Sequence, residues 1–161
     1  MSGPDHDLPE VYLKPGEFFL AREATLIWTI LGSCVSVSFW SDKLNAGALC
    51  HSMLPRHPGI SSTDLDEGHR YMDYAIRDIA AQFDNLGANR AEVQVKLFGG
   101  ADVLTPSDSL RPTVGRLNQE AAIEVLREEG FDVSASSLGG KCGVKIFFNT
   151  GTGEVLLRRP C

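Results

Sequence analysis

The chain has 161 residues, of which 43% are hydrophobic and 22% are charged, proportions that are ordinary for one soluble globular domain. Its net charge is −6, and the acidic residues are spread without a compensating basic stripe, which argues against binding to nucleic acid or anionic lipid. The chain has no apolar run near the roughly 18 residues of a membrane helix and no secretory signal at its start, so we expect a cytoplasmic protein without membrane insertion.

The sequence pattern divides the chain into a flexible segment, residues 1–10, and a single folded domain, residues 11–161. The first segment is rich in Pro, Asp and Gly and is expected to be loosely held. Apolar, β-branched or alternating stretches in the rest of the chain predict strands. In chain order these are residues 17–22, 25–31, 35–39, 46–53, 91–98, 131–136, 144–149 and 154–158.

Two amphipathic helices are predicted between these strands. Apolar residues recur at spacings of three and four across residues 64–86, with Thr63 or Asp64 placed to cap the start. A second helix runs through Ala121 and stops at Gly130. Many strands with two helices, not strictly alternating, indicate an α+β domain with mixed sheets and with the helices packed on one side. The strand order stays open.

Cys34 is the first candidate for chemistry. It follows Gly32 and Ser33 in a turn between two apolar strands, a position that can expose a thiol and surround it with backbone N–H groups. Such groups stabilise the oxyanion that develops during acyl transfer. A thiol with an ordinary pKa also needs a nearby histidine to become an effective nucleophile near neutral pH.

His51 is the best of four histidines for that purpose. It lies in a predicted strand, where neighbouring strands would hold it rigidly, whereas His6 belongs to the loose start and His57 to a loop. His69 lies in the first turns of a predicted helix, where solvation is the ordinary expectation. Composition and spacing alone still favour the plainer interpretation, in which the cysteine is a small buried apolar residue and the histidine a satisfied core group.

The other three cysteines, Cys50, Cys142 and Cys161, are expected to be free thiols, because cysteines are sparse in this chain and the cytosol is reducing. Cys50 and His51, with His57 six residues on, supply three metal-ligating groups without a clear fourth, which is weak evidence for zinc. We therefore expect no metal.

Two motifs together change the balance between these interpretations. The segment Leu31-Gly-Ser-Cys-Val35, followed by His51-Ser-Met-Leu-Pro55, resembles the paired signature of the CheD family, the chemoreceptor glutamine deamidases of bacterial chemotaxis. Further along, the chain shows the order of glycines and asparagine typical of that family, at Gly99-Gly-Ala101, Val114-Gly115 with Asn118, and Gly139-Gly140. The later glycine pairs by themselves are also typical of ordinary tight turns.

The resemblance implies a three-layer α/β/β fold with mixed sheets, similar to that of toxins that deamidate glutamine. It also implies a cofactor-free amidohydrolase, a protein-glutamine glutaminase. In such an enzyme Cys34 attacks a receptor glutamine carboxamide, ammonia leaves, and water hydrolyses the thioester to glutamate, with His51 as general base. The substrates would be methyl-accepting chemotaxis receptors, and a CheC-type phosphatase is a further candidate partner.

Thr29 is the third candidate site residue. The family carries a threonine six residues before the cysteine, where this chain has Trp28, with Thr29 one place later. One place along a strand is the opposite face. Either Thr29 does not orient the catalytic pair, or a bulge shifts the strand and restores its position.

Two other functions remain open. An adaptor that binds receptors or the phosphatase without catalysis is supported by Trp28 and by the absence of arginines common in the family near Leu117 and Lys145. Intact Cys34 and His51 count against it. A hydrolase of small amides with a similar fold is the third possibility.

Overall fold

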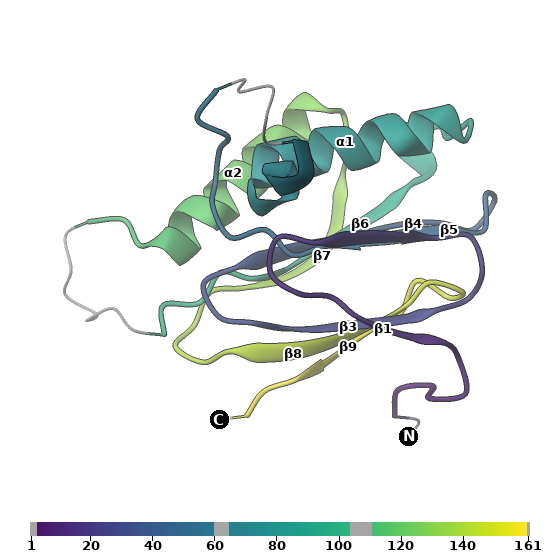
Figure 1. The fold of residues 1–161 in the computed structure, drawn as a ribbon, viewed down its shortest axis with the longest axis horizontal. Helices are drawn as coiled ribbons and strands as arrows, with labels where there is room; N and C mark the ends of the chain where they lie inside the picture. The colour runs from purple at the N-terminus through teal and green to yellow at the C-terminus, as the bar shows by residue number, and fades with distance from the viewer. Residues whose placement is uncertain (1–2, 60–64, 104–110, 161) are drawn as a thin grey trace.

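The computed structural model describes residues 3–59, 65–103 and 111–160, which form three layers (Figure 1). One layer is a four-stranded sheet in the order β1 (Glu10–Tyr12), β3 (Leu26–Leu31), β8 (Val144–Asn149), β9 (Val155–Arg158). The middle layer is a five-stranded sheet in the order β2 (Phe18–Ala21), β5 (Ala46–Cys50), β4 (Val35–Ser41), β6 (Gln94–Gly99), β7 (Val133–Leu138). The third layer holds the helices α1 (Met72–Asn85) and α2 (Val114–Glu128).

Both sheets are mixed, as the sequence pattern predicts. The pair β1–β3 is parallel within a sheet whose other pairs are antiparallel. In the five-stranded sheet, only β6–β7 is parallel. The two helices cover one face of that sheet (Figure 1), so the expected α+β architecture with helices on one side is confirmed.

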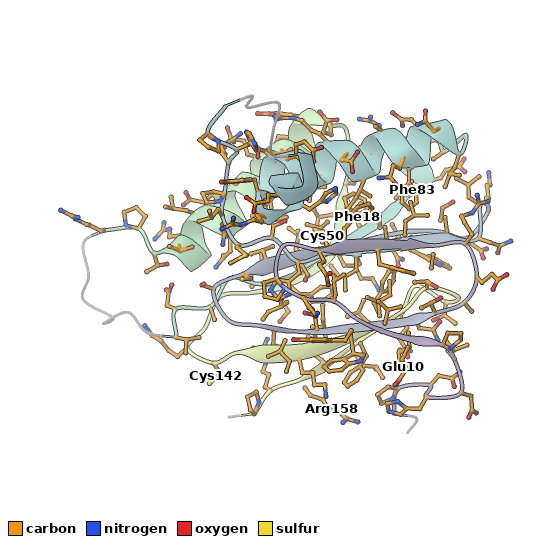
Figure 2. The ribbon with its side chains drawn as sticks, viewed as in Figure 1. Glu10, Phe18, Cys50, Phe83, Cys142 and Arg158 are labelled. Carbon is orange, nitrogen blue, oxygen red and sulfur yellow. The ribbon has the colours of Figure 1, made fainter. Side chains whose placement is uncertain are left out.

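Two apolar cores follow from this layering. The larger one joins the helices to the five-stranded sheet and includes Val37, Phe39 and Cys50 from the strands and Phe83 from α1. Figure 2 shows Cys50 and Phe83 on this side of the sheet, whereas Arg158 lies on the outer side of the other sheet. The smaller core lies between the two sheets and is formed by both. Alternation along the strands of the five-stranded sheet sends successive side chains to the two cores.

Several predicted boundaries differ from the structure. Helix α1 begins at Met72 after a 3-10 helix, η1 (Leu65–Arg70), and its N-cap, Tyr71, makes no side-chain cap hydrogen bond. The proposed caps Thr63 and Asp64 lie outside the described residues. A short 3-10 helix, η2 (Arg90–Glu92), occupies part of the strand predicted at 91–98.

Strand β5 also ends earlier than predicted, at Cys50, so His51 lies just beyond a strand rather than within one. The β1 strand was not predicted at all, because its three residues are too few to show a pattern. Within the described residues, no helix has the length and apolar character that crossing a membrane requires.

Candidate active site

Cys34 and His51 flank one short antiparallel bridge between the segments that carry them. Val35 and Ser52 exchange two backbone hydrogen bonds, each of 3.0 Å. Directly paired residues point to one face of a ladder and their sequence neighbours point to the other. Val35 packs into the helix-side core, while Cys34 packs against the core between the sheets. The thiol and the imidazole therefore share the face that looks toward the four-stranded sheet.

Thr29 reaches the same space from the opposite sheet. Its hydroxyl oxygen lies 2.7 Å from His51 Nδ1 and 2.6 Å from the carbonyl oxygen of Leu13. A carbonyl only accepts, so the single hydroxyl hydrogen goes to Leu13 and the hydroxyl oxygen accepts from His51 Nδ1–H. This fixes the neutral imidazole in the Nδ1–H tautomer and leaves Nε2 as a proton acceptor.

Trp28 occupies the outer face of the same strand. Its ring centroid lies 4.4 Å from that of Tyr12, and Lys145 Nζ lies 4.5 Å from it. The pairing of β3 with β8 runs over Leu26–Leu31 without a register shift, so no bulge is present there. Thr29 faces His51 simply because the regular alternation of β3 turns it inward.

Burial makes the resting pair electrically neutral. His51 is 2% exposed, and this burial lowers its pKa to about 4, although the Leu13 backbone and the charge of Glu17 act in the opposite direction. Burial also raises the pKa of the half-buried Cys34 thiol. Near neutral pH, burial therefore favours a neutral thiol and a neutral imidazole over a thiolate–imidazolium pair.

A glycine loop fixes the backbone of the nucleophile turn. Gly100 N–H donates to the Cys34 carbonyl at 2.8 Å, and Ala101 N–H donates to the Gly32 carbonyl at 2.9 Å. Gly99 adopts φ +102°, and a Cβ placed on it would lie 2.3 Å from the Cys34 carbonyl oxygen. Only glycine permits this approach, so the pair Gly99–Gly100 is part of the site rather than an ordinary tight turn.

Helix α2 packs directly on this loop and holds the two motif segments together. A Cβ on Gly115 would lie 2.6 Å from the Ala101 carbonyl oxygen, so the close packing requires glycine. One turn later, the fully buried Asn118 donates from Nδ2 to the carbonyls of Ser33 and Met53, both at 3.0 Å. Asn118 belongs to the family pattern in the sequence, but its spacing alone does not show a contact between a helix and two distant loops.

The remaining histidines are engaged away from the site. His69 Nε2 lies 2.7 Å from Asp78 Oδ2, and its ring stacks on Phe18. His57 makes an edge contact with Tyr71. Cys50 points to the helix-side core, opposite to its neighbour His51. Within the described ranges, no three metal-ligating side chains come together.

The expectation of free thiols holds for Cys34 and Cys50 but is wrong for Cys142. The first two are free, and complete burial raises the pKa of Cys50 to about 11. Cys142, in the loop before β8 (Figure 2), is disulfide-bonded. Sparse cysteines favoured free thiols, but pairing depends on how close the chain brings two sulfurs, which the spacing does not reveal. Cys161 lies outside the described residues.

Comparison with known proteins agrees with the motifs. Residues 53–159 match the family described as CheD chemotactic sensory transduction. A probable chemoreceptor glutamine deamidase CheD 2 of Geobacter sulfurreducens is 45% identical over 152 residues, covering 94% of this chain and 91% of that protein. A probable chemoreceptor glutamine deamidase CheD of Oleidesulfovibrio alaskensis is 40% identical over 158 residues, covering 96% and 74%.

A solved structure is also similar, though more distantly. A Neisseria meningitidis protein shares 13% identity at a TM-score of 0.48, covering 84% of this chain and 64% of its own. That likeness is too remote to bear on the chemistry. The family match spans most of the chain, from just after His51, and the alignment with the Geobacter relative extends over both the cysteine motif and the histidine motif. The chain therefore belongs to the CheD family.

Proposed function

We propose that this protein hydrolyses the side-chain amide of glutamine residues in chemoreceptors, with Cys34 as nucleophile, His51 as general base and Thr29 as the residue that orients the base. The similar proteins are named as probable chemoreceptor glutamine deamidases, which supplies the substrate class. The described residues supply a thiol, a neutral imidazole and a hydroxyl at the junction of two sheets.

In the first half of the reaction, the Cys34 sulfur attacks the carboxamide carbon while its proton passes to His51 Nε2. The π electrons of the carbonyl move to the oxygen and form a tetrahedral intermediate. When the intermediate collapses, the C–N bond breaks and His51 returns the proton to the departing nitrogen. Ammonia leaves, and a thioester joins Cys34 to the receptor side chain.

The second half regenerates the thiol. His51, neutral again, takes a proton from water as the water oxygen attacks the thioester carbon. The C–S bond then breaks, and the proton returns to sulfur. The product is a glutamic acid side chain, which loses its proton to solvent near neutral pH, so the reaction adds one negative charge to the receptor, a change that can shift a signalling equilibrium.

The hydrogen bond between Thr29 and His51 is the observation that carries this proposal. A histidine buried only for packing needs no particular tautomer, whereas a general base needs one unprotonated nitrogen. The Thr29 hydroxyl, committed by its bond to Leu13, holds the Nδ1 proton and leaves Nε2 free for a proton from the thiol. Geometry and the pKa of about 4 both describe a base that is unprotonated at neutral pH.

The test incubates the protein with a purified receptor cytoplasmic fragment and follows glutamine conversion by peptide mass spectrometry, as a mass gain of about one dalton per site. Cys34→Ala should abolish conversion. His51→Ala should lower it about 100-fold to 10,000-fold, the usual value of general base catalysis. The two losses should not add in the double variant, because the residues act as a unit.

Cys50→Ala is the matched control, since it removes a thiol that points away from the site and should leave conversion intact. Receptor binding is measured on the same samples by sedimentation. Retained conversion in Cys34→Ala would overturn the mechanism. Binding of receptor or of a CheC-type phosphatase without conversion in the unaltered protein would instead favour the non-catalytic adaptor.

A further inference from the structure

The peptide group between Ser33 and Cys34 is held from one side by helix α2. Asn118 Nδ2 donates to the Ser33 carbonyl oxygen at 3.0 Å. The chain contains no cis peptide bond among its described residues, and the C=O and N–H of a trans peptide point in opposite directions. The Cys34 N–H therefore points away from α2, toward the side of the sheet on which the Cys34 thiol lies.

That N–H has no hydrogen-bond acceptor within the part of the chain that the structure describes. Among the hydrogen bonds of the described residues, none has Cys34 N as its donor. Two of the groups next to it are engaged: the Cys34 carbonyl accepts from Gly100 N–H, and Val35 N–H donates to the Ser52 carbonyl. A backbone N–H without a protein acceptor, next to the nucleophilic sulfur, is available to donate to an oxyanion that forms on a bound substrate.

Asn118 holds this loop at a cost in free energy, because only one of its two side-chain polar groups has hydrogen-bond partners among the described residues. Its amide orientation is settled by its two acceptors, since only the NH₂ group can donate to both carbonyls. The Oδ1 atom is then buried, with no hydrogen-bond donor among the described residues. Leaving a buried acceptor unpaired is unfavourable, so the orientation of this side chain is set by the two bonds that its NH₂ group donates.

We propose that the Cys34 N–H is an oxyanion donor for the amide hydrolysis and that Asn118 is the positioning residue that aims it. This inference rests on the proposed function. As the sulfur–carbon bond forms, the carbonyl π electrons move to the substrate oxygen, and the N–H donates to that oxygen while the thiol proton goes to His51. The second contact of Asn118, to the Met53 carbonyl, locks the histidine segment to the same peptide.

The first test uses the unaltered protein labelled with ¹⁵N-cysteine and adds [1-¹³C]propanal, which is the glutamine side chain with its carboxamide replaced by an aldehyde. Attack by Cys34 gives a hemithioacetal, detected by its ¹³C signal, whose oxygen occupies the place of the oxyanion. The Cys34 amide proton should move downfield on adduct formation, while the Cys50 amide, on the helix-side core strand, should stay in place.

The outcomes separate the two proposals. An adduct on Cys34 with no change at its amide would overturn the oxyanion assignment and leave the nucleophile intact. No adduct on Cys34 at all would overturn the proposed function, and this inference with it. Neither result depends on whether an altered protein folds.

The second test compares Asn118→Ala with Glu120→Ala, an exposed position on the same helix. Loss of one oxyanion donor commonly lowers kcat about 100-fold to 1,000-fold, so Asn118→Ala should lower kcat in this range with KM nearly unchanged. Alkylation of Cys34 by iodoacetamide displaces iodide and develops no oxyanion, so its rate should be preserved. Glu120→Ala should match the unaltered protein in both measurements.

Two results would contradict the role of Asn118. A folded Asn118→Ala protein with unchanged kcat would show that the loop needs no clamp. A parallel fall in alkylation and in kcat would place Asn118 in support of the thiol and imidazole rather than of the peptide N–H.

Discussion

The Thr29 hydroxyl and the His51 imidazole are joined across the two sheets by a hydrogen bond of 2.7 Å. Thr29 belongs to the four-stranded sheet, and His51 directly follows a strand of the five-stranded sheet. The tautomer of the base is thus decided by contact between layers. Cys34 also lies where the two sheets meet, because its turn joins β3 of one sheet to β4 of the other.

Replacing Thr29 by valine should lower activity with little change in shape. Thr29→Val removes the hydroxyl that holds His51 Nδ1–H, and loss of a histidine-orienting partner commonly costs about 10-fold to 100-fold. Thr29→Ser keeps the hydroxyl and serves as the control. The measurements are kcat for glutamine conversion and the ¹⁵N shifts of the His51 ring, which report the tautomer. Equal kcat values for the two variants would contradict the orienting role.

Activity should persist well below the ordinary titration range of histidine. The base works only when unprotonated, and burial lowers the His51 pKa to about 4. As pH falls, kcat/KM should therefore decline near pH 4 and not near the pKa of about 6.5 of a solvated imidazole. The measurement is a pH profile of glutamine conversion over the range in which the protein stays folded. A decline centred near pH 6.5 would show that His51 is solvated.

The same burial should make stability depend on pH. Between about pH 4 and 6.5 the unfolded chain protonates His51 while the folded chain does not. The folded pKa is the lower one, so stability is full above about pH 6.5 and is lost as pH falls toward 4. The His51 contribution to the free energy of unfolding should decrease by roughly 3 kcal/mol over this window.

Urea unfolding at several pH values measures this effect, with His51→Gln as the comparison. The variant should keep the pH dependence that comes from His69, whose pKa burial also lowers. It should lack the part of the pH dependence that comes from protonation of His51 in the unfolded chain. Identical pH slopes for the two proteins would contradict the depressed pKa.

Gly99 should tolerate alanine much less than Gly87 does. Both glycines have positive φ, +102° and +88°, but a Cβ on Gly99 meets the Cys34 carbonyl at 2.3 Å, whereas nothing lies within 4 Å of one on Gly87. Gly87→Ala should cost about 1–2 kcal/mol of backbone strain. Gly99→Ala should cost about 1–3 kcal/mol more from overpacking and should also lower kcat. Thermal unfolding measures the loss of stability and glutamine conversion the loss of activity. Equal losses in Gly99→Ala and Gly87→Ala would contradict a role for the close contact between Gly99 and the Cys34 carbonyl.

The sequence determined most of the elements and both reactive groups. Alternation and turn residues predicted β8 at its observed bounds and β3, β4 and β9 within a residue or two at each end, because a half-buried strand records its two faces in its own residues. Cys34 and His51 were selected from the residue types that such chemistry needs and from the motifs around them. These are local properties, so they can be predicted from the sequence without knowledge of the strand order.

The tertiary structure decided which groups meet. The sequence showed that Trp28 and Thr29 face opposite ways but not which of them faces inward, because both stand among apolar residues. That choice is made by the second sheet, which buries the Thr29 face against His51. The contacts of Asn118 with the two motif segments, 85 and 65 residues away in the chain, arise in the same way. Local periodicity determines which side chains share a face of a strand or helix. Only the packing of elements that are distant in the sequence determines which residues that face contacts.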